Sequence, residues 1–550
     1  MHRYSGYRSI ACLLCIACLP AMLWAQQDSG YDDLIAVHQQ FIDWRQKLDD
    51  SSIDRKTIAV RVRQLQPLQQ RLQALPVAQW RAQGRHEQVS DYLAVRAQLD
   101  EYDFMLQISR PWLRDPGWYV DRMLRVAFTE LPLQGDEKQQ LLTRLQQTRK
   151  LSDLARNNLS EAAADYADLA LHALSHADGV GHGHPRRKVP PAGVIGWYQD
   201  LLMRAEKQQP ELVAEVSAAL SAVRNFQQWL QIKRTSIKAD SGVGRNAFDW
   251  YLQQVKMLPY DADDILLMSR RELDRLRAFY ALERHRNRDL PELELAASEA
   301  EYIQRIGRVD ADVRAFIKSR QLLTVPDYIP TNFMEMGFNA PWMVRPDGPN
   351  YWENIQFRDP SPDHWHAVIP GHRFDSMLRQ RLDHPIRKNL YDGVRAEGWA
   401  VYLEEMPLQL GFYQQRPRTR ELIYNFGLFR AVRSIGDVML QLNRMSTSEV
   451  IAYWMQVTPG LDENVARVDA EIYLRRPPGY GIGYTIGHLQ LQQLLADVRW
   501  QQGDAFVLSD FHDRLLQYGW MPLALIRHAM TDHDDEIQRL LPHTPVESLL

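Results

Sequence analysis

Apolar side chains recur every three or four residues along most of the chain, a pattern that favours helices over strands. In the stretch 261–282, Leu266, Leu273, Leu276 and Tyr280 share one face, and a cluster of acidic residues opens the segment as at a helix N-terminus. Similar patterns occur at 60–75, 136–175, 197–232, 420–445 and 485–500. Because runs of alternating β-branched residues are nearly absent, the sequence predicts a mainly α, large multi-helix fold.

Length and charge narrow the class of protein further. The chain has 550 residues, 45% of them hydrophobic and 24% charged, which is typical of globular proteins and excludes wholesale disorder or a simple coiled coil. The formal charge is −4, so no strongly basic balance indicates nucleic acid as a partner. Short extended segments are expected only around 320–358, where proline and asparagine interrupt the helical pattern, so any β element is small.

The N-terminus has the layout of a secretory signal peptide. A short basic start precedes an apolar run from Ile10 to Trp24, and Ala25 is followed by polar residues. We expect residues 1–25 to be cleaved off after Ala25, which makes the protein periplasmic or secreted. No later stretch approaches the ~18 uninterrupted apolar residues of a membrane helix, so no membrane span is expected in the mature chain.

All three cysteines, Cys12, Cys15 and Cys18, lie within this N-terminal segment. Cleavage after Ala25 therefore leaves a mature chain without disulfides, thiol chemistry or thiolate metal sites. Ala17 precedes Cys18, so acylation of that cysteine is an alternative, although the apolar run continues past it. An uncleaved membrane anchor is a further alternative.

A loop rich in histidine, glycine and proline divides the mature chain. Its composition predicts a solvated surface loop or linker, and metal uptake by His176, His182 and His184 is the alternative interpretation. The expected organisation is a signal peptide at 1–25, an N-terminal helical region at 26–175, this loop at 176–196, and a C-terminal helical region at 197–550.

The C-terminal region holds the residues best suited to chemistry. His366 and His372 precede Glu397, and two histidines with a carboxylate from a neighbouring helix are the minimal protein ligands of a catalytic zinc. An unbroken helix would separate residues six apart by roughly 240°, but Pro370-Gly371 interrupts the helix and lets the imidazoles converge. The usual zincin spacing of four is absent, so spacing alone leaves a structural, hydrogen-bonded histidine pair as the commoner alternative.

These motifs resemble those of the bacterial domain of unknown function 885 (DUF885), a large exported helical family likened to zinc metallopeptidases. The first two motifs of the family are His-Glu-x-x-Pro-Gly-His and Glu-Gly-Trp-Ala-x-Tyr-x-Glu. A third motif is Pro-Gly followed by a tyrosine and a glycine, and a fourth characteristic segment lies near the C-terminus. The segments of this chain that are similar to them are 366–372, 397–404, 478–487 and 511–523. The resemblance is strongest from about residue 240 to residue 530 and implies a metallopeptidase-like architecture.

The chain departs from the family pattern at three positions. Ala367 stands where the family has a glutamate, which in the zincin mechanism takes a proton from zinc-bound water and delivers it to the leaving amine. Arg373 stands where a second histidine is common, and Tyr480 stands where the family has glutamine. The resemblance therefore implies an intact ligand set without its usual base.

By this resemblance, His366, His372 and Glu397 are the metal ligands, and one zinc ion per chain is the expected cofactor. Glu404 lies seven residues after Glu397 on the same helical face, where it would orient a ligand histidine or form a salt bridge. Tyr484 would donate a hydrogen bond to a developing oxyanion or pack as a core aromatic. Glu404 and Tyr484 are therefore the candidate catalytic residues.

Three further side chains near the motifs have two interpretations each. Trp399 and Tyr402 are interpreted as core residues rather than cofactor contacts. Arg373 would pair with a substrate carboxylate, as suits cleavage near a free C-terminus, or form an ion pair with Asp375 or Glu397.

The expected function is an exported, metal-dependent hydrolase of peptides or related amides with an altered base, and its expected partner is such a substrate. Candidates to replace the base are Glu404, Glu405, Glu353 and His364. One alternative is a catalytically inactive pseudo-peptidase that binds peptides. Another is a helical scaffold or glycan-binding protein, for which the scattered 15 Trp and 23 Tyr residues are weak support. Metal content separates this last alternative from the others, and turnover separates the first two.

Overall fold

The computed structural model describes residues 13–49, 53–176, 191–337, 340–343, 345 and 347–550, with side chains from residue 30 onward. Over these residues the fold is all α, without strands, and an isolated parallel bridge joins Ala163 to Ala239. The mainly α prediction is confirmed. In the described part of 320–358, the interrupted pattern forms two short helices, α14 (Phe333–Met336) and α15 (Tyr351–Arg358).

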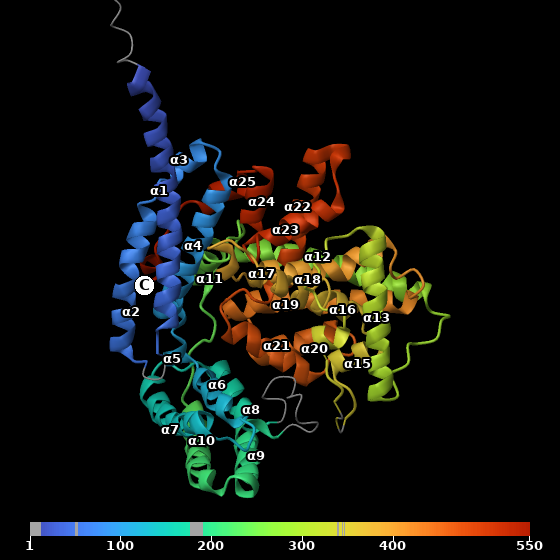
Figure 1. Cartoon of the computed structure of the whole chain (residues 1–550). Helices are drawn as coiled ribbons and strands as arrows, with labels where there is room; N and C mark the ends of the chain where they lie inside the picture. Colours follow the sequence, from blue (N-terminus) through green and yellow to red (C-terminus); the bar gives the residue numbers. More distant parts are fainter. Residues whose placement is uncertain (1–12, 50–52, 177–190, 338–339, 344, 346) are drawn as a thin grey trace, which may run out of the picture.

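The N-terminal helices lie along one side of the molecule (Figure 1). They are α1 (Leu13–Gln46), α2 (Arg55–Gln73), α3 (Val77–Ala82) and α4 (His86–Phe104), followed by a π-helical turn at Met105–Ser109. The first turns of α1 project from the body, whereas Leu34, Val37 and Phe41 are buried against it (Figure 1). Residues 1–12 of the predicted signal peptide lie outside the described residues. Among the helices that are described, none is both long and apolar enough to cross a membrane.

A second group of helices forms a bundle at the lower end of Figure 1. Its members are α5 (Pro111–Arg114), α6 (Pro116–Ala127), α7 (Gly135–Asn158), α8 (Ala164–Ser175), α9 (Gly193–Gln208) and α10 (Val213–Arg234). Helices α9 and α10 pack against α7 and α8, so the chain on both sides of the predicted loop at 176–196 shares this bundle. Residues 177–190, with His182 and His184, lie outside the described residues.

The centre of the molecule is built from long buried helices (Figure 1). They are α12 (Ala262–Arg286), α18 (Gly393–Leu410), α19 (Pro417–Gln441) and α22 (Ile482–Gln502). Two shorter helices pack against them, α11 (Arg245–Gln254) against α12 and α24 (Leu523–Thr531) against α22. The helix predicted at 261–282 is confirmed as α12, where the Asp261 carboxylate accepts hydrogen bonds from the first-turn N–H groups of Asp263 and Asp264.

Two glycines bring α18 and α22 into close contact. A Cβ atom on Gly398 would lie 2.4 Å from the carbonyl carbon of Gly487, and one on Gly487 would lie 2.1 Å from the oxygen of Val394. Only glycine permits this approach, because any side chain would push the two helices apart. The glycine in the Glu-Gly-Trp-Ala segment therefore sets the distance between α18 and α22.

The remaining helices surround this centre. They are α13 (Glu299–Arg320), α16 (Ser361–Ala367), α17 (His372–Gln380), α20 (Thr447–Val457), α21 (Glu463–Arg475), α23 (Leu508–Gln517) and α25 (Asp535–Leu540), with short 3₁₀ turns at Pro210–Leu212, Arg387–Asn389, Gly503–Ala505 and Val546–Leu549. Helix α16 contacts α13, α18 and α19, and α21 contacts α19. The two histidines of the motif therefore lie beside the most buried helices of the molecule.

Candidate metal centre

The segment between His366 and His372 is a break between two helices, as the sequence predicts. His366 lies in the last turn of α16 and His372 is the first residue of α17, and the Ile369–Pro370 peptide bond between them is cis. A Cβ atom on Gly371 would lie 1.9 Å from the carbonyl oxygen of His366, so no other residue fits where the chain folds back.

The turn is held by a side chain from the next helix in the motif. The indole N–H of Trp399 donates to the carbonyl oxygen of Pro370 at 3.0 Å. Trp399 is buried, as is Tyr402, whose hydroxyl lies 2.9 Å from His512 Nε2. The interpretation of both aromatics as core residues is confirmed, and Trp399 also locks the chain reversal against α18.

His366, His372 and Glu397 converge. His366 Nε2 lies 3.2 Å from His372 Nε2, and Glu397 Oε2 lies 3.7 Å from the first nitrogen and 3.4 Å from the second. With bonds of about 2.0–2.2 Å, a tetrahedral ion holds its ligand atoms about 3.3–3.6 Å apart. The triangle formed by the three atoms therefore has the dimensions of one face of a zinc site.

The two oxygens of Glu397 have different surroundings. The hydroxyl of Tyr480 donates to Oε1 at 2.8 Å. Oε2 faces the histidines and is buried without a hydrogen-bond partner among the described residues. A buried carboxylate oxygen without a donor is costly, so this atom is suited to a cation that completes the site. Tyr480, which departs from the family pattern, fixes the orientation of the carboxylate.

Glu404 combines the two roles considered for it. Its Oε1 lies 2.7 Å from His366 Nδ1 and 2.9 Å from the Arg430 guanidinium. The contact with Nδ1 directs the Nε2 lone pair of His366 toward Glu397, as carboxylates do behind metal-bound histidines. Since its acceptor oxygen already serves a histidine and an arginine, Glu404 is poorly placed to act as the general base.

Protonation states follow from these contacts. Burial, with the nearby Arg430, lowers the pKa of His366 to about 4, so its ring is neutral at neutral pH, as a metal ligand must be. Burial also opposes charge on His372, but the Glu397 carboxylate outweighs it and raises the pKa of His372. The same two histidines and Arg430 hold the pKa of Glu397 well below its usual range despite burial.

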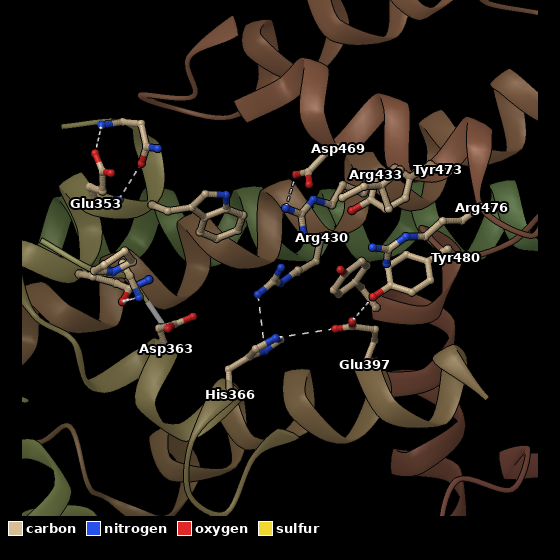
Figure 2. Close-up of a pocket in the computed structure, with 17 residues that line it drawn as sticks. Glu353, Asp363, His366, Glu397, Arg430, Arg433, Asp469, Tyr473, Arg476 and Tyr480 are labelled. Atoms are coloured by element: carbon tan, nitrogen blue, oxygen red, sulfur yellow. Dashed lines mark hydrogen bonds and ion pairs between the residues drawn. The ribbon is translucent and has the colours of Figure 1, made fainter. Parts of the chain in front are cut away.

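A cavity of about 260 Å³ opens beside the cluster (Figure 2). Tyr484 lines it, with its ring 4.8 Å from the Arg430 guanidinium and 4.9 Å from that of Arg433. Burial and the nearby Glu397 raise the pKa of Tyr484 above its ordinary value, so its hydroxyl stays protonated and can donate.

The residues considered as replacement bases do not gather here. Glu405 pairs with Arg275, and His364 lies 3.0 Å from an Asp310 oxygen. Glu353 lines the cavity but its carboxylate accepts from Arg345 at 2.8 Å. Ala367 is buried at the end of α16 and is not part of the cavity wall.

Arg373 has a different partner from those considered for it. Its guanidinium donates to the carbonyl oxygen of Met336 at 3.0 Å. Asp375 pairs with Arg395 at 2.5 Å and accepts from the Trp520 indole at 2.8 Å. Arg373 therefore links α17 to the end of α14 rather than pairing with Asp375.

Several residues of the cavity wall were not indicated by the sequence patterns. They are Asp363, Arg430, Arg433, Asp469 and Arg476. Arg430 and Arg433, one turn apart in the helix predicted at 420–445, are fully charged yet buried, and charged residues within such an apolar stretch are the signal that could have identified them. Asp363 lies one turn before His366 in α16 (Figure 2).

A second cluster of metal-ligand types lies on another part of α18. Glu405, Glu272 of α12 and His488 of α22 bring one ligand atom each within 4.8 Å of the others. Here Arg275 donates to both carboxylates at 2.6 Å, and Gln492 contacts His488 Nε2 at 3.0 Å. Like the first cluster, it could hold a metal by its residue types, but a guanidinium already satisfies its carboxylates.

Comparisons with known proteins identify a family domain and a fold. Residues 364–530 match a family described as "Bacterial protein of unknown function (DUF885)". No curated protein matches the sequence. A solved structure of a putative lipoprotein of unknown function from Shewanella oneidensis has a TM-score of 0.67 at 16% identity over 92% of this chain and 98% of its own. A putative lipoprotein from Colwellia psychrerythraea has a TM-score of 0.54 at 18% identity over 74% of this chain and 77% of its own. At these identities the two structures establish a shared fold only.

Proposed function

We propose that the protein, whose residues 364–530 form a DUF885 domain, is an exported, metal-dependent hydrolase of peptides or related amides. The observation that carries the proposal is the triangle of His366 Nε2, His372 Nε2 and Glu397 Oε2, whose edges of 3.2–3.7 Å suit a tetrahedral zinc ion. One such ion would act as a Lewis acid on the scissile carbonyl and on a water molecule.

The side chains around the triangle have separate tasks in this proposal. Glu404 holds the His366 ring through Nδ1, and Tyr480 holds Glu397 through Oε1. Tyr484, protonated and lining the cavity, donates to the oxygen on which negative charge develops.

Proton transfer requires a carboxylate in place of the family's glutamate, which is Ala367 here. Among the acids of the cavity wall, Asp363 lies on the same helix as His366 and one turn before it, and both side chains face the cavity (Figure 2). We assign Asp363 the role of proton acceptor. Its distance along the helix differs from that of the usual base, so we expect weak hydrolysis.

The test combines metal analysis with turnover. Elemental analysis after mild dialysis should find about one zinc per chain, and hydrolysis of unstructured peptides, followed by mass spectrometry, should stop with a chelator and return with zinc. Tyr484→Phe should lower kcat about 10²–10³-fold without changing the zinc content. Metal-free protein that retains full turnover would exclude a metal-dependent mechanism.

A second candidate is favoured by Ala367 itself. Without the glutamate, the site would bind metal and peptide but not hydrolyse, as in a pseudo-peptidase. Zinc at one equivalent and peptide binding without turnover by the native chain would select this function. Absence of both zinc and peptide binding would instead favour a helical scaffold or glycan-binding protein.

Export is supported by the apolar run from Ile10 to Trp24 and by the description of both structural neighbours as lipoproteins. Cleavage after Ala25 gives a mature chain without cysteine, whereas processing before Cys18 gives an acylated one. Intact-mass measurement of the protein from its native envelope distinguishes the two, and a chain that begins at Met1 would contradict export by a cleaved signal.

A further inference from the structure

Arg476 is an exposed cation at the wall of the cavity beside the candidate metal centre. It follows the last residue of α21, and its guanidinium lies 5.0 Å from the centre of the Tyr480 ring (Figure 2). Tyr480 in turn donates to Glu397 at 2.8 Å. The positive charge is therefore one aromatic ring away from the residues proposed to hold the metal.

The preceding residue, Arg475, is an arginine with a structural role. Arg475 pairs with Asp115 at 2.9 Å and with Asp121 at 2.7 Å, and it also contacts Glu471. In the part of the chain that the structure describes, no carboxylate lies within ion-pair distance of Arg476. Two consecutive arginines thus differ completely in their electrostatic partners.

The other charged groups of the cavity wall have partners of their own. Arg430 pairs with Glu404 at 2.9 Å, and Arg433 pairs with Asp469. Glu353 pairs with Arg345 at 2.8 Å. Arg476 is therefore the cation of this wall that is left for an anionic ligand, and a guanidinium suits the two oxygens of a carboxylate.

The size of the cavity limits the ligand. Its volume of about 260 Å³ is below the ~300–1,000 Å³ typical of sites for drug-sized molecules. Arg476 also belongs to the wall of a second cavity, of about 470 Å³, which lies toward α4 and α6. A ligand confined to the first cavity would end at Arg476, whereas a longer peptide would continue past Arg476 into the second cavity.

We propose that Arg476 binds the C-terminal carboxylate of a short peptide, which makes the protein selective for peptides whose reacting bond lies one or two residues from a free C-terminus. An extended peptide spans ~3.3–3.6 Å per residue. A terminal carboxylate one or two residues beyond the reacting bond therefore suits a cation that the Tyr480 ring separates from Glu397. The inference rests on the proposed function, because it identifies the class of substrate for the same site.

The test compares peptide pairs that differ only in the terminal group. Acetyl-Ala-Leu and acetyl-Phe-Leu with free carboxylates are titrated by calorimetry into the full-length, zinc-supplemented protein, alongside their C-terminal amides. The free acids should bind about tenfold more tightly than the amides. Arg476→Gln should abolish this preference, and Arg271→Gln, which changes an exposed arginine of α12 away from the cavity, should leave it intact.

Three results would overturn the inference. The first is equal affinity for acids and amides, which would mean that the bound peptide continues into the second cavity. The others are a preference for acids that survives in Arg476→Gln, and no binding of either form. The proposed hydrolase can fail separately. If the acids bind through Arg476 and no peptide is hydrolysed, the carboxylate site stands and the hydrolase does not. If peptides are hydrolysed without preference for free acids, the proposed hydrolase is supported and the carboxylate site at Arg476 is contradicted.

Discussion

Helix α18 contributes Glu397 to one cluster of histidine and glutamate and Glu405 to another. At the second cluster, the Arg275 guanidinium donates a hydrogen bond to each of the two carboxylates. At the first, Arg430 pairs with Glu404 and leaves Glu397 Oε2 buried without a donor. The residue types are alike, but the guanidinium reaches both carboxylates of the second cluster, whereas the Glu397 oxygen that faces the two histidines has no hydrogen-bond donor among the described residues. Under the proposed function, we therefore expect the metal ion at the first cluster.

The largest expected effect comes from restoring the missing base at the first cluster. Ala367→Glu should raise peptide hydrolysis about 10²–10⁴-fold, because general-base assistance is typically of that size. Initial rates on unstructured peptides at fixed zinc content measure it. A variant slower than the native chain would mean that Asp363 already supplies efficient base assistance and that Ala367 makes room for substrate.

Removing one histidine from each cluster tests the comparison directly. His372→Ala should lower zinc affinity by more than about a hundredfold, since even the partners behind a ligand contribute 10–100-fold. His488→Ala, the matched change at the second cluster, should leave one zinc per chain. Competition with a chromophoric chelator measures both affinities. Equal losses in the two variants would remove the distinction between the clusters.

The two adjacent glutamates of α18 provide a finer test. Glu404→Gln should weaken zinc binding about 10–100-fold, because His366 loses its charged acceptor. Glu405→Gln breaks the ion pair with Arg275 and should change zinc affinity less than about twofold. Circular dichroism of both variants checks that α18 is intact, and a larger effect on zinc from Glu405→Gln would contradict the assignment.

Asp437 is a buried carboxylate whose hydrogen-bond donors are backbone N–H groups. Its Oδ2 accepts from the N–H groups of Gly481 and Ile482 at the start of α22, while Oδ1 is buried without a partner among the described residues. Burial raises the pKa of Asp437 to about 7, against 3.8 ordinarily. The native state therefore holds a proton that the unfolded state releases between these values.

This raised pKa gives a pH dependence of definite sign. The stability contributed by protonated Asp437 is fully present below pH 3.8 and is lost as the pH rises through about 7. Asp437→Asn, which cannot ionise, should reduce the fall in unfolding free energy between pH 5 and pH 8 by on the order of 2 kcal/mol. Urea unfolding at several pH values measures this slope, and an unchanged slope in the variant would exclude Asp437 as its source.

The sequence alone was sufficient for the helical fold, whereas the metal-ligand residues were proposed from their resemblance to a family. Periodicity and the acidic N-cap predict α12, and Pro370-Gly371 predicts the break that brings His366 and His372 together. These features are local, because helix formation and its interruption depend on residues within a few positions of one another.

The partners of those residues were decided by the tertiary structure. Arg430, Tyr480 and Arg476 lie 26, 76 and 72 residues beyond Glu404 in sequence, yet α19, the turn before α22 and the end of α21 bring them to one cavity. Nothing in the spacing of charges along the chain indicates that Arg275 donates to Glu405 while one oxygen of Glu397 has no hydrogen-bond donor among the described residues. Electrostatic pairing depends on distances across packed helices, and these are set by contacts such as Gly398 against Gly487, which bring together residues far apart in the sequence.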